Sequence, residues 1–230
     1  MRYEEFLEIV RISRQDLFRK TFDRYRDRIK VKKEETVMRN LEKIFCATLR
    51  IANRKGFGTM SMRDLSRESD LSMGALYTYF SSKEELLSML QEQGRALVRQ
   101  VLEDQVRDAA GPRDRLRKVV RAHLYISEAL QPWFYFSYME TKNLSEPERG
   151  NAIRAELETE RFIAEILADG ERRGVFRRRD HQLAAGVLKA MLQDWYVKRG
   201  KYARREISVD RYADFVLDVM ETFYGLSPES

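Results

Sequence analysis

The sequence predicts an all-α protein, and three observations lead to that prediction. Among 230 residues only 11 are glycine and four are proline, and every proline lies beyond position 111. Sandwiches and barrels need frequent turn residues, so this composition disfavours them. Leu, Glu, Arg and Ala are abundant and favour helices. Apolar residues also recur at helical spacing along most of the chain.

The composition excludes several classes of protein and of site. One cysteine, Cys46, cannot form an internal disulfide or a thiolate metal cluster, which fits a reducing cytoplasm. With only His123 and His181 available, a multi-histidine metal site is disfavoured, and we expect no metal and no cofactor. No apolar run approaches the ~20 residues of a membrane helix, so we expect no membrane association.

The N-terminal half reads as helices separated by clear stop and start signals. Helical spacing covers residues 3–30 and 36–54, and the second segment stops at Gly56, a C-cap signal. Two short helices follow, over about 62–68 and 72–79, and then a long one from about 82 to 109. The residues expected to cap these three helices are Ser61 (with Asp64 in a variant capping box), Ser72 and Ser82.

The C-terminal half is also read as helical. Proline and glycine residues mark the boundaries between its segments. The predicted segments are 113–130, 132–143, 147–173, 181–199 and 208–224.

Residues 59–87, TMSMRDLSRESDLSMGALYTYFSSKEELL, carry the most specific signal. Two short helices joined by a tight turn form a helix-turn-helix, whose second helix can lie in a major groove. From Val37 to Leu86 the chain resembles the TetR (tetracycline-repressor-like) family of transcriptional regulators. The resemblance implies an N-terminal extension at 1–34, a DNA-binding domain at 35–82 and a helical ligand-binding and dimerisation domain at 83–230. It further implies a homodimer that binds a palindromic double-stranded DNA operator and is released as a repressor by a small apolar or amphipathic effector.

The chemistry of the helix-turn-helix residues agrees with DNA binding. Gly74 lacks a side chain and lets the helix approach the duplex, while tyrosine hydroxyls and Lys83 at a helix start can contact phosphate. Met73 and Ala75 can contact thymine methyl groups, and Thr78 can hydrogen-bond. Without the resemblance, the tyrosines would be read as core aromatics. The candidate DNA-binding residues are Ser61, Arg63, Ser72, Met73, Gly74, Ala75, Tyr77, Thr78, Tyr79 and Lys83.

Two positions depart from the family pattern. Asp70 stands at the turn position that is usually glycine, and Asp tolerates the left-handed conformation better than most residues. Tyr79 stands where histidine is usual, and its hydroxyl can still donate to phosphate. We therefore expect a changed sequence preference and retained binding.

An aromatic cluster over residues 125–139 and later residues on another helix suggest an effector site. The resemblance implies a pocket between such helices, although simple core packing explains the same pattern. The candidate effector residues are His123, Tyr125, Trp133, Phe134, Tyr138, Met191 and Trp195. The last two predicted helices carry broad apolar stripes, which predict a four-helix dimer interface or, alternatively, internal core.

The extension at residues 1–34 has 11 basic and 7 acidic residues and several large apolar ones. We expect a helix docked by Phe6, Leu17, Phe22 and Ile29 on the DNA-binding unit or the partner subunit. Its basic end would then lie near the duplex, unless the helix is simply solvated. That basic end comprises Arg24, Arg26, Arg28, Lys30, Lys32 and Lys33.

Two other classes of function remain as alternatives. No glycine-rich phosphate loop, metal-ligand spacing or nucleophilic triad is apparent, so we expect that the protein is not an enzyme. A helical ligand-binding adaptor that does not bind DNA is the second candidate. A salt-dependent gel shift of duplex DNA would distinguish the adaptor from a regulator.

Overall fold

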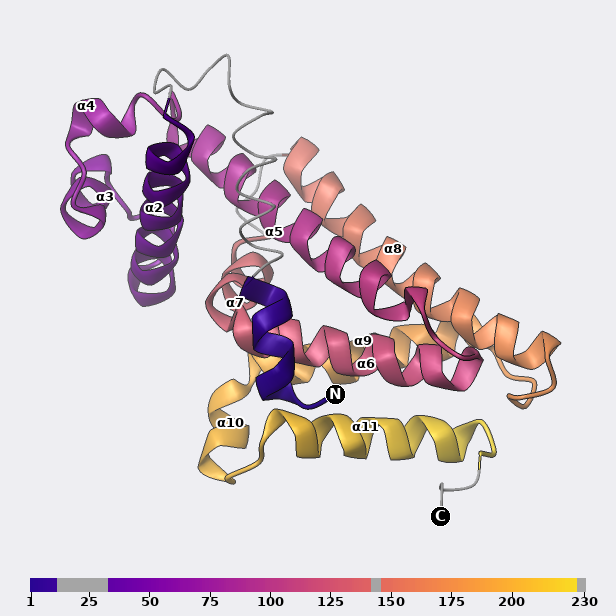
Figure 1. The fold of residues 1–230 in the computed structure, drawn as a ribbon. Coiled ribbons are helices and arrows are strands. Elements are labelled where there is room, and N and C mark those ends of the chain that lie inside the picture. The colour runs from indigo at the N-terminus through magenta and orange to yellow at the C-terminus, as the bar shows by residue number, and fades with distance from the viewer. Residues whose placement is uncertain (12–32, 142–145, 227–230) are drawn as a thin grey trace. The chain divides into compact units, whose positions relative to one another are not determined.

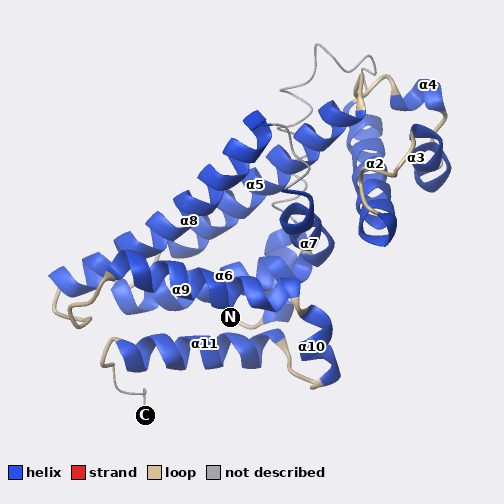
Figure 2. Ribbon diagram, turned by 180° about the vertical axis from the view of Figure 1, so that it is seen from behind, coloured by secondary structure: helices blue, strands red, loops and turns tan. Residues whose placement is uncertain are grey.

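The fold is seen in a computed structural model that describes residues 1–11, 33–141 and 146–226 (Figure 1). Within these ranges all regular structure is helical, which confirms the predicted all-α class (Figure 2). A short N-terminal helix covers residues 3–11. The helices that follow are α2 (Glu34–Lys55), α3 (Met62–Ser69), α4 (Met73–Leu76), α5 (Lys83–Arg107), α6 (Pro112–Ala129), α7 (Gln131–Glu140), α8 (Glu146–Arg172), α9 (His181–Val197), α10 (Arg199–Arg204) and α11 (Val209–Phe223). None of them is long and apolar enough to cross a membrane.

The helix starts follow the capping residues that the sequence supplies. The Ser61 hydroxyl accepts a hydrogen bond from the Asp64 N–H while the Asp64 carboxylate accepts one from the Ser61 N–H, which is the expected capping box. Ser72 caps α4 in the same way through the N–H of Ala75. At the other end of α2, Gly56 has φ 86°, the left-handed half of backbone space that favours glycine.

Two helices end earlier than the sequence predicts. The α-helix of α4 stops at Leu76, and the chain continues to Tyr79 through tight turns in which Thr78 N–H bonds to the Ala75 carbonyl. The segment predicted at 181–199 divides at Lys198, where φ is −111° and ψ is 33°, so that α10 becomes a separate helix. In both places the predicted helical spacing continues, but the backbone hydrogen bonding changes.

The chain packs as two compact units. The helix-turn-helix unit comprises the described residues within 11–97 and 132–149, and the bundle unit comprises those within 1–10, 98–131 and 150–230. The division therefore lies inside α5, at Leu97, and not at residue 82 as the sequence suggested. Helix α7 also differs from its predicted place, because it packs with the helix-turn-helix unit and not with the effector domain.

Trp133 explains why α7 belongs to the helix-turn-helix unit. Its indole N–H donates to the Leu90 carbonyl of α5 at 3.2 Å. A Cβ at Gly94 would lie only 1.9 Å from the indole ring, so the ring fills the space that this glycine leaves open. The Ser137 hydroxyl adds a hydrogen bond to the Gln91 side-chain oxygen at 2.8 Å.

In the bundle unit, α6 packs along α11 (Figure 1). The buried carboxylate of Glu221 on α11 accepts hydrogen bonds from Arg113 and Arg117 on α6, at 2.7 Å and 2.5 Å. These guanidinium groups hold the pKa of Glu221 below its usual value, although burial opposes them. A buried carboxylate with two charged donors is thus satisfied in the unit's interior.

The described part of the N-terminal extension lies on the bundle unit. Phe6 is fully buried, and its ring centroid lies 5.5 Å from that of Tyr125 on α6. The Tyr3 N–H and the Tyr125 hydroxyl both donate to Asp210 of α11. The expectation that the extension docks on the DNA-binding unit or the partner subunit is therefore wrong for this part.

The remaining predictions for the extension cannot be compared with the structure. Its other apolar anchors and its basic end, apart from the exposed Lys33, lie outside the described residues.

Replacing either of two glycines by alanine should have opposite consequences for stability. Gly94→Ala should lower the free energy of unfolding by about 1–3 kcal/mol, because the new methyl group meets the Trp133 ring. Gly74→Ala should leave it unchanged or raise it by up to about 1 kcal/mol, because an added Cβ there meets nothing within 4 Å. Chemical denaturation of both variants measures the difference, and equal stabilities would contradict the packing described for Trp133.

Candidate nucleic-acid interface

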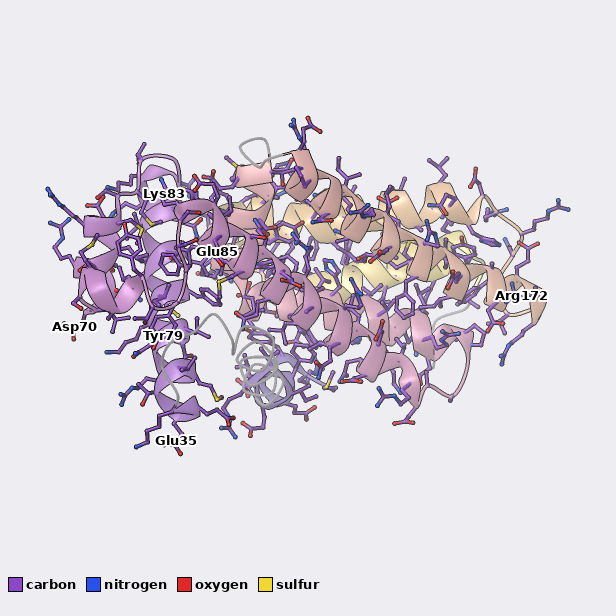
Figure 3. All side chains as sticks on the ribbon, turned by 90° about the horizontal axis from the view of Figure 1, so that it is seen from above. Glu35, Asp70, Tyr79, Lys83, Glu85 and Arg172 are labelled. Atoms are coloured by element: carbon purple, nitrogen blue, oxygen red, sulfur yellow. The ribbon has the colours of Figure 1, made fainter. Side chains whose placement is uncertain are left out.

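The turn between α3 and α4 fixes the angle of the helix-turn-helix. Asp70 adopts φ 56° and ψ 40°, so the left-handed conformation expected at this position is confirmed. The Ser66 hydroxyl donates to the Leu71 carbonyl at 2.6 Å and closes the turn from the other side. Leu65 and Leu76 are fully buried and hold the two helices together. Figure 3 shows Asp70 at the outer edge of the unit.

One face of α4 is open to solvent. Ser72, Gly74 and Tyr77 are exposed, and Tyr77 retains 49% of its accessible surface. No atom lies within 4 Å of a Cβ added to Gly74, so the fold itself does not require glycine there. Met73 and Ala75 are half-buried beside them, and Arg63 is exposed at the start of α3.

Tyr79 does not lie on this open face. Its side chain is only 3% exposed, and the Asn40 amide of α2 donates to its hydroxyl at 2.8 Å. Burial raises the pKa of the phenol. The position does not support the predicted phosphate contact, and Tyr79 is a core aromatic that joins the end of the helix-turn-helix to α2 (Figure 3). The sequence contained no signal that singled out Asn40.

Lys83, at the start of α5, holds the loop between α2 and α3 (Figure 3). Its ammonium donates to the carbonyls of Phe57 and Gly58 at 3.0 Å and 3.1 Å and lies 5.0 Å from the Phe57 ring centroid. From α7, the buried Glu140 carboxylate accepts the Phe57 N–H at 3.2 Å. Two of the three ammonium protons are therefore used inside the protein, and one remains for a phosphate.

Two other candidate hydroxyls also have internal partners. The Ser61 hydroxyl donates to Asp64 and accepts from its N–H, so it is fully used by the capping box. The Thr78 hydroxyl donates to the Ala75 carbonyl at 2.6 Å and keeps only its acceptor capacity. The structure thus leaves the following predicted residues with groups turned to solvent or partly so: Arg63, Ser72, Met73, Gly74, Ala75 and Tyr77.

The predicted effector residues divide between the two units. Trp133, Phe134 and Tyr138 lie on α7 in the helix-turn-helix unit, and His123, Tyr125, Met191 and Trp195 lie in the bundle unit. Tyr125 has the structural role described above. Trp195 is fully buried, donates to Glu128 and stacks on Tyr202, so it is also a core residue.

The remaining members of this set differ in burial. Trp133 and Phe134 are buried, Tyr138 is exposed and Met191 is half-buried. Only His123 combines full burial with a titratable group.

Comparison with known proteins assigns the family. Residues 44–90 match the family described as "Bacterial regulatory proteins, tetR family", and residues 109–220 match "Tetracyclin repressor-like, C-terminal domain". The chain belongs to the TetR family. It is a DNA-binding transcriptional regulator, and the matched N-terminal range contains the whole helix-turn-helix described above.

Individual relatives agree with this assignment. The HTH-type transcriptional regulator HbdR of Aromatoleum sp. is 22% identical over 180 residues, covering 78% of this chain and 79% of HbdR. The fold is similar to that of AibR in complex with isovaleryl coenzyme A and operator DNA, with a TM-score of 0.69 and 20% identity over 82% of this chain and all of that one. It is also similar to FadR from Bacillus subtilis in complex with stearoyl-CoA, with a TM-score of 0.64 and 16% identity over 79% of this chain and 98% of that one.

The two tyrosines of the helix-turn-helix should respond differently to loss of the hydroxyl. Tyr77→Phe should weaken operator binding about 5–10-fold without changing stability, because an exposed hydroxyl that donates to phosphate is lost. Tyr79→Phe should instead lower stability by about 1 kcal/mol, because it removes the partner of the Asn40 amide. Gel shifts and denaturation curves measure both effects, and an unchanged affinity for Tyr77→Phe would refute its phosphate contact.

Proposed function

We propose that this TetR-family regulator binds a palindromic operator as a homodimer through α4 and is released as a repressor by an apolar or amphipathic effector. The observation that carries the proposal is the open face of α4. Side chains in the helix-turn-helix core have internal partners, whereas Gly74 and Tyr77 face solvent with no structural requirement for their identity. A surface of this kind suits close approach to a duplex.

The homodimer rests on exposed apolar surface in the bundle unit. Helices α9 and α11 each bury one side in the core, and α11 packs against α9. Their other sides carry large apolar residues that face solvent in the single chain. A monomeric protein rarely exposes so much contiguous apolar surface. These exposed residues are Leu183, Val187, Phe215, Val219 and Phe223.

A second copy of the chain is the occupant that this surface fits best. Two helices from each of two chains can form a four-helix interface around a twofold axis. That symmetry would present two copies of α4 to the two halves of a palindrome. The notebook of apolar positions along α9 and α11 thus divides into a core side and a proposed dimer side.

For the effector we propose acyl thioesters of coenzyme A. Two proteins of similar fold, AibR and FadR from Bacillus subtilis, have structures with isovaleryl coenzyme A and stearoyl-CoA. The bundle unit has an apolar interior formed by fully buried residues of α6, α8 and α9, which suits an acyl chain. An effector that binds the DNA-free state more tightly lowers operator affinity by the same factor.

The experiment that tests this proposal is a gel shift of an operator selected from random duplex DNA, followed by titration with acyl-CoA of increasing chain length. We expect salt-dependent binding by a dimer, and release by at least one chain length. The same acyl-CoA should raise the melting temperature, by about 2.7 kcal/mol of stabilisation at a concentration 100 times Kd. Failure to bind any duplex at low salt would refute the regulator proposal and favour the adaptor.

Two charged substitutions should separate the dimer face from the core. Phe215→Glu should give a folded monomer with at least tenfold weaker operator binding, because Phe215 is 63% exposed in the single chain. Trp195→Glu should destabilise the fold by more than about 3 kcal/mol, because it removes a fully buried indole and places a carboxylate beside Glu128.

Sedimentation and circular dichroism of the two variants provide the measurement. Glu replacing Ser208, the exposed-side cap of α11, is not a suitable control because capping would be lost. Gln182→Glu on the exposed surface of α9 is better matched. A dimeric Phe215→Glu protein would contradict the proposed interface.

A further inference from the structure

Lys189 on α9 is a charged residue in an apolar environment. Its side chain is only 7% exposed, and Ala185, Leu188 and Leu192 of the same helix are fully buried around it. Within the described part of the chain its ammonium has neither a hydrogen bond nor an ion pair within 4 Å. Burial lowers its pKa, while Glu156 and Glu160 act on it at longer range and favour its charged form.

The surroundings of Lys189 come from two further helices. Helix α6, which packs against α9, contributes His123, whose side chain is 2% exposed. Burial and the charge of Lys189 hold the pKa of this imidazole well below its ordinary value, so it is neutral at neutral pH. From α8, a carboxylate oxygen of Glu160 comes within 3.9 Å of the position that a Cβ would occupy at Gly186, one turn before Lys189.

The fold alone does not account for this lysine. Burying an ammonium without a direct partner costs several kcal/mol, and an apolar side chain of similar size would pack better. A lysine offers three donors, and here none of them is used within the described residues. A ligand that supplies an acceptor would remove this cost on binding, so the free energy of pairing would contribute to affinity.

We infer that the Lys189 ammonium is the group that recognises the polar end of the effector, and that it binds an uncharged acyl carbonyl oxygen such as that of a thioester. This inference rests on the proposed effector-released function and names a residue and a chemical class for it. Lys189 donates the hydrogen bond, and the neutral His123 ring lies in the same interior region. The acyl chain then lies among the apolar residues of α6, α8 and α9.

The local charges favour a carbonyl over a carboxylate. Two carboxylates, Glu156 and Glu160, already act on the one ammonium. A bound fatty-acid anion would bring a third negative charge into a region of low dielectric, where like charges repel strongly. A thioester carbonyl accepts the same hydrogen bond and adds no charge.

The test compares two ligands that differ in a single oxygen atom. Octanoyl-CoA carries the thioester carbonyl, and S-octyl-CoA is the thioether that lacks it. Isothermal titration of the full-length protein should show octanoyl-CoA binding at least tenfold more tightly than the thioether, and more tightly than octanoate. Lys189→Met should bind the two CoA ligands equally, with operator affinity and dimerisation unchanged.

Matched variants separate this role from a structural one. Lys198→Met removes an exposed lysine that pairs with Asp194 at the end of α9, and it should keep the tenfold preference. Lys189→Gln retains an N–H donor and should keep part of it, which provides a second test if the methionine variant does not fold. Glu160→Gln should raise the affinity for octanoate, because one repelling charge is removed.

Each outcome decides the inference. Equal preference in wild type and in both Lys189 variants would overturn the role of Lys189 while leaving the acyl-CoA proposal intact. Tighter binding of octanoate than of octanoyl-CoA would overturn the uncharged class. If wild type binds operator but none of the CoA ligands, the proposed effector class fails and this inference fails with it.

Discussion

The loop between α2 and α3 is the constraint on which the DNA-binding surface depends. Helices α3 and α4 have eight and four residues, far fewer than an isolated helix needs to be stable in water. Their position must come from contacts elsewhere in the unit. Lys83 binds the loop carbonyls from the start of α5, and Glu140 binds the Phe57 N–H from α7. The Phe57 ring, in edge contact with Phe136, fills the space between these polar anchors.

These contacts give known family positions a double use. A lysine at the start of α5 is expected to contact phosphate, and here it also satisfies two backbone carbonyls that the loop would otherwise leave to solvent. Tyr79 shows the opposite case, because its hydroxyl is taken by Asn40 inside the unit. The surface left for DNA is consequently smaller than the sequence suggested and centres on α4 itself.

The bundle unit follows a different principle, in which helices are amphipathic on two sides. On α11, Val216 and Met220 are buried while Phe215 and Val219 face solvent. A helix in the middle of an assembly needs apolar residues on both sides. Lys189 interrupts this pattern on α9, and it does so at a buried position where a purely structural residue would be apolar.

Local signals in the sequence determined the fold class, most helix positions and the caps. Ser61, Asp64, Ser72 and Gly56 act through bonds to residues at most four positions away, so their roles can be read from spacing alone. The same holds for Asp70, whose left-handed conformation depends on its own side chain and the turn. The family resemblance rested on this same local segment.

Tertiary structure alone decided which of the candidate residues are available for binding. Helical spacing marks a residue as apolar or aromatic, but whether it meets solvent depends on partners far away in sequence, as Tyr79 meets Asn40 and Trp133 meets Gly94. For the same reason the sequence could not divide the α9 and α11 stripes into core and exposed sides, or show that Lys189 is buried. Burial is a property of the packed chain, because it is set by contacts between helices and not by the period within one of them.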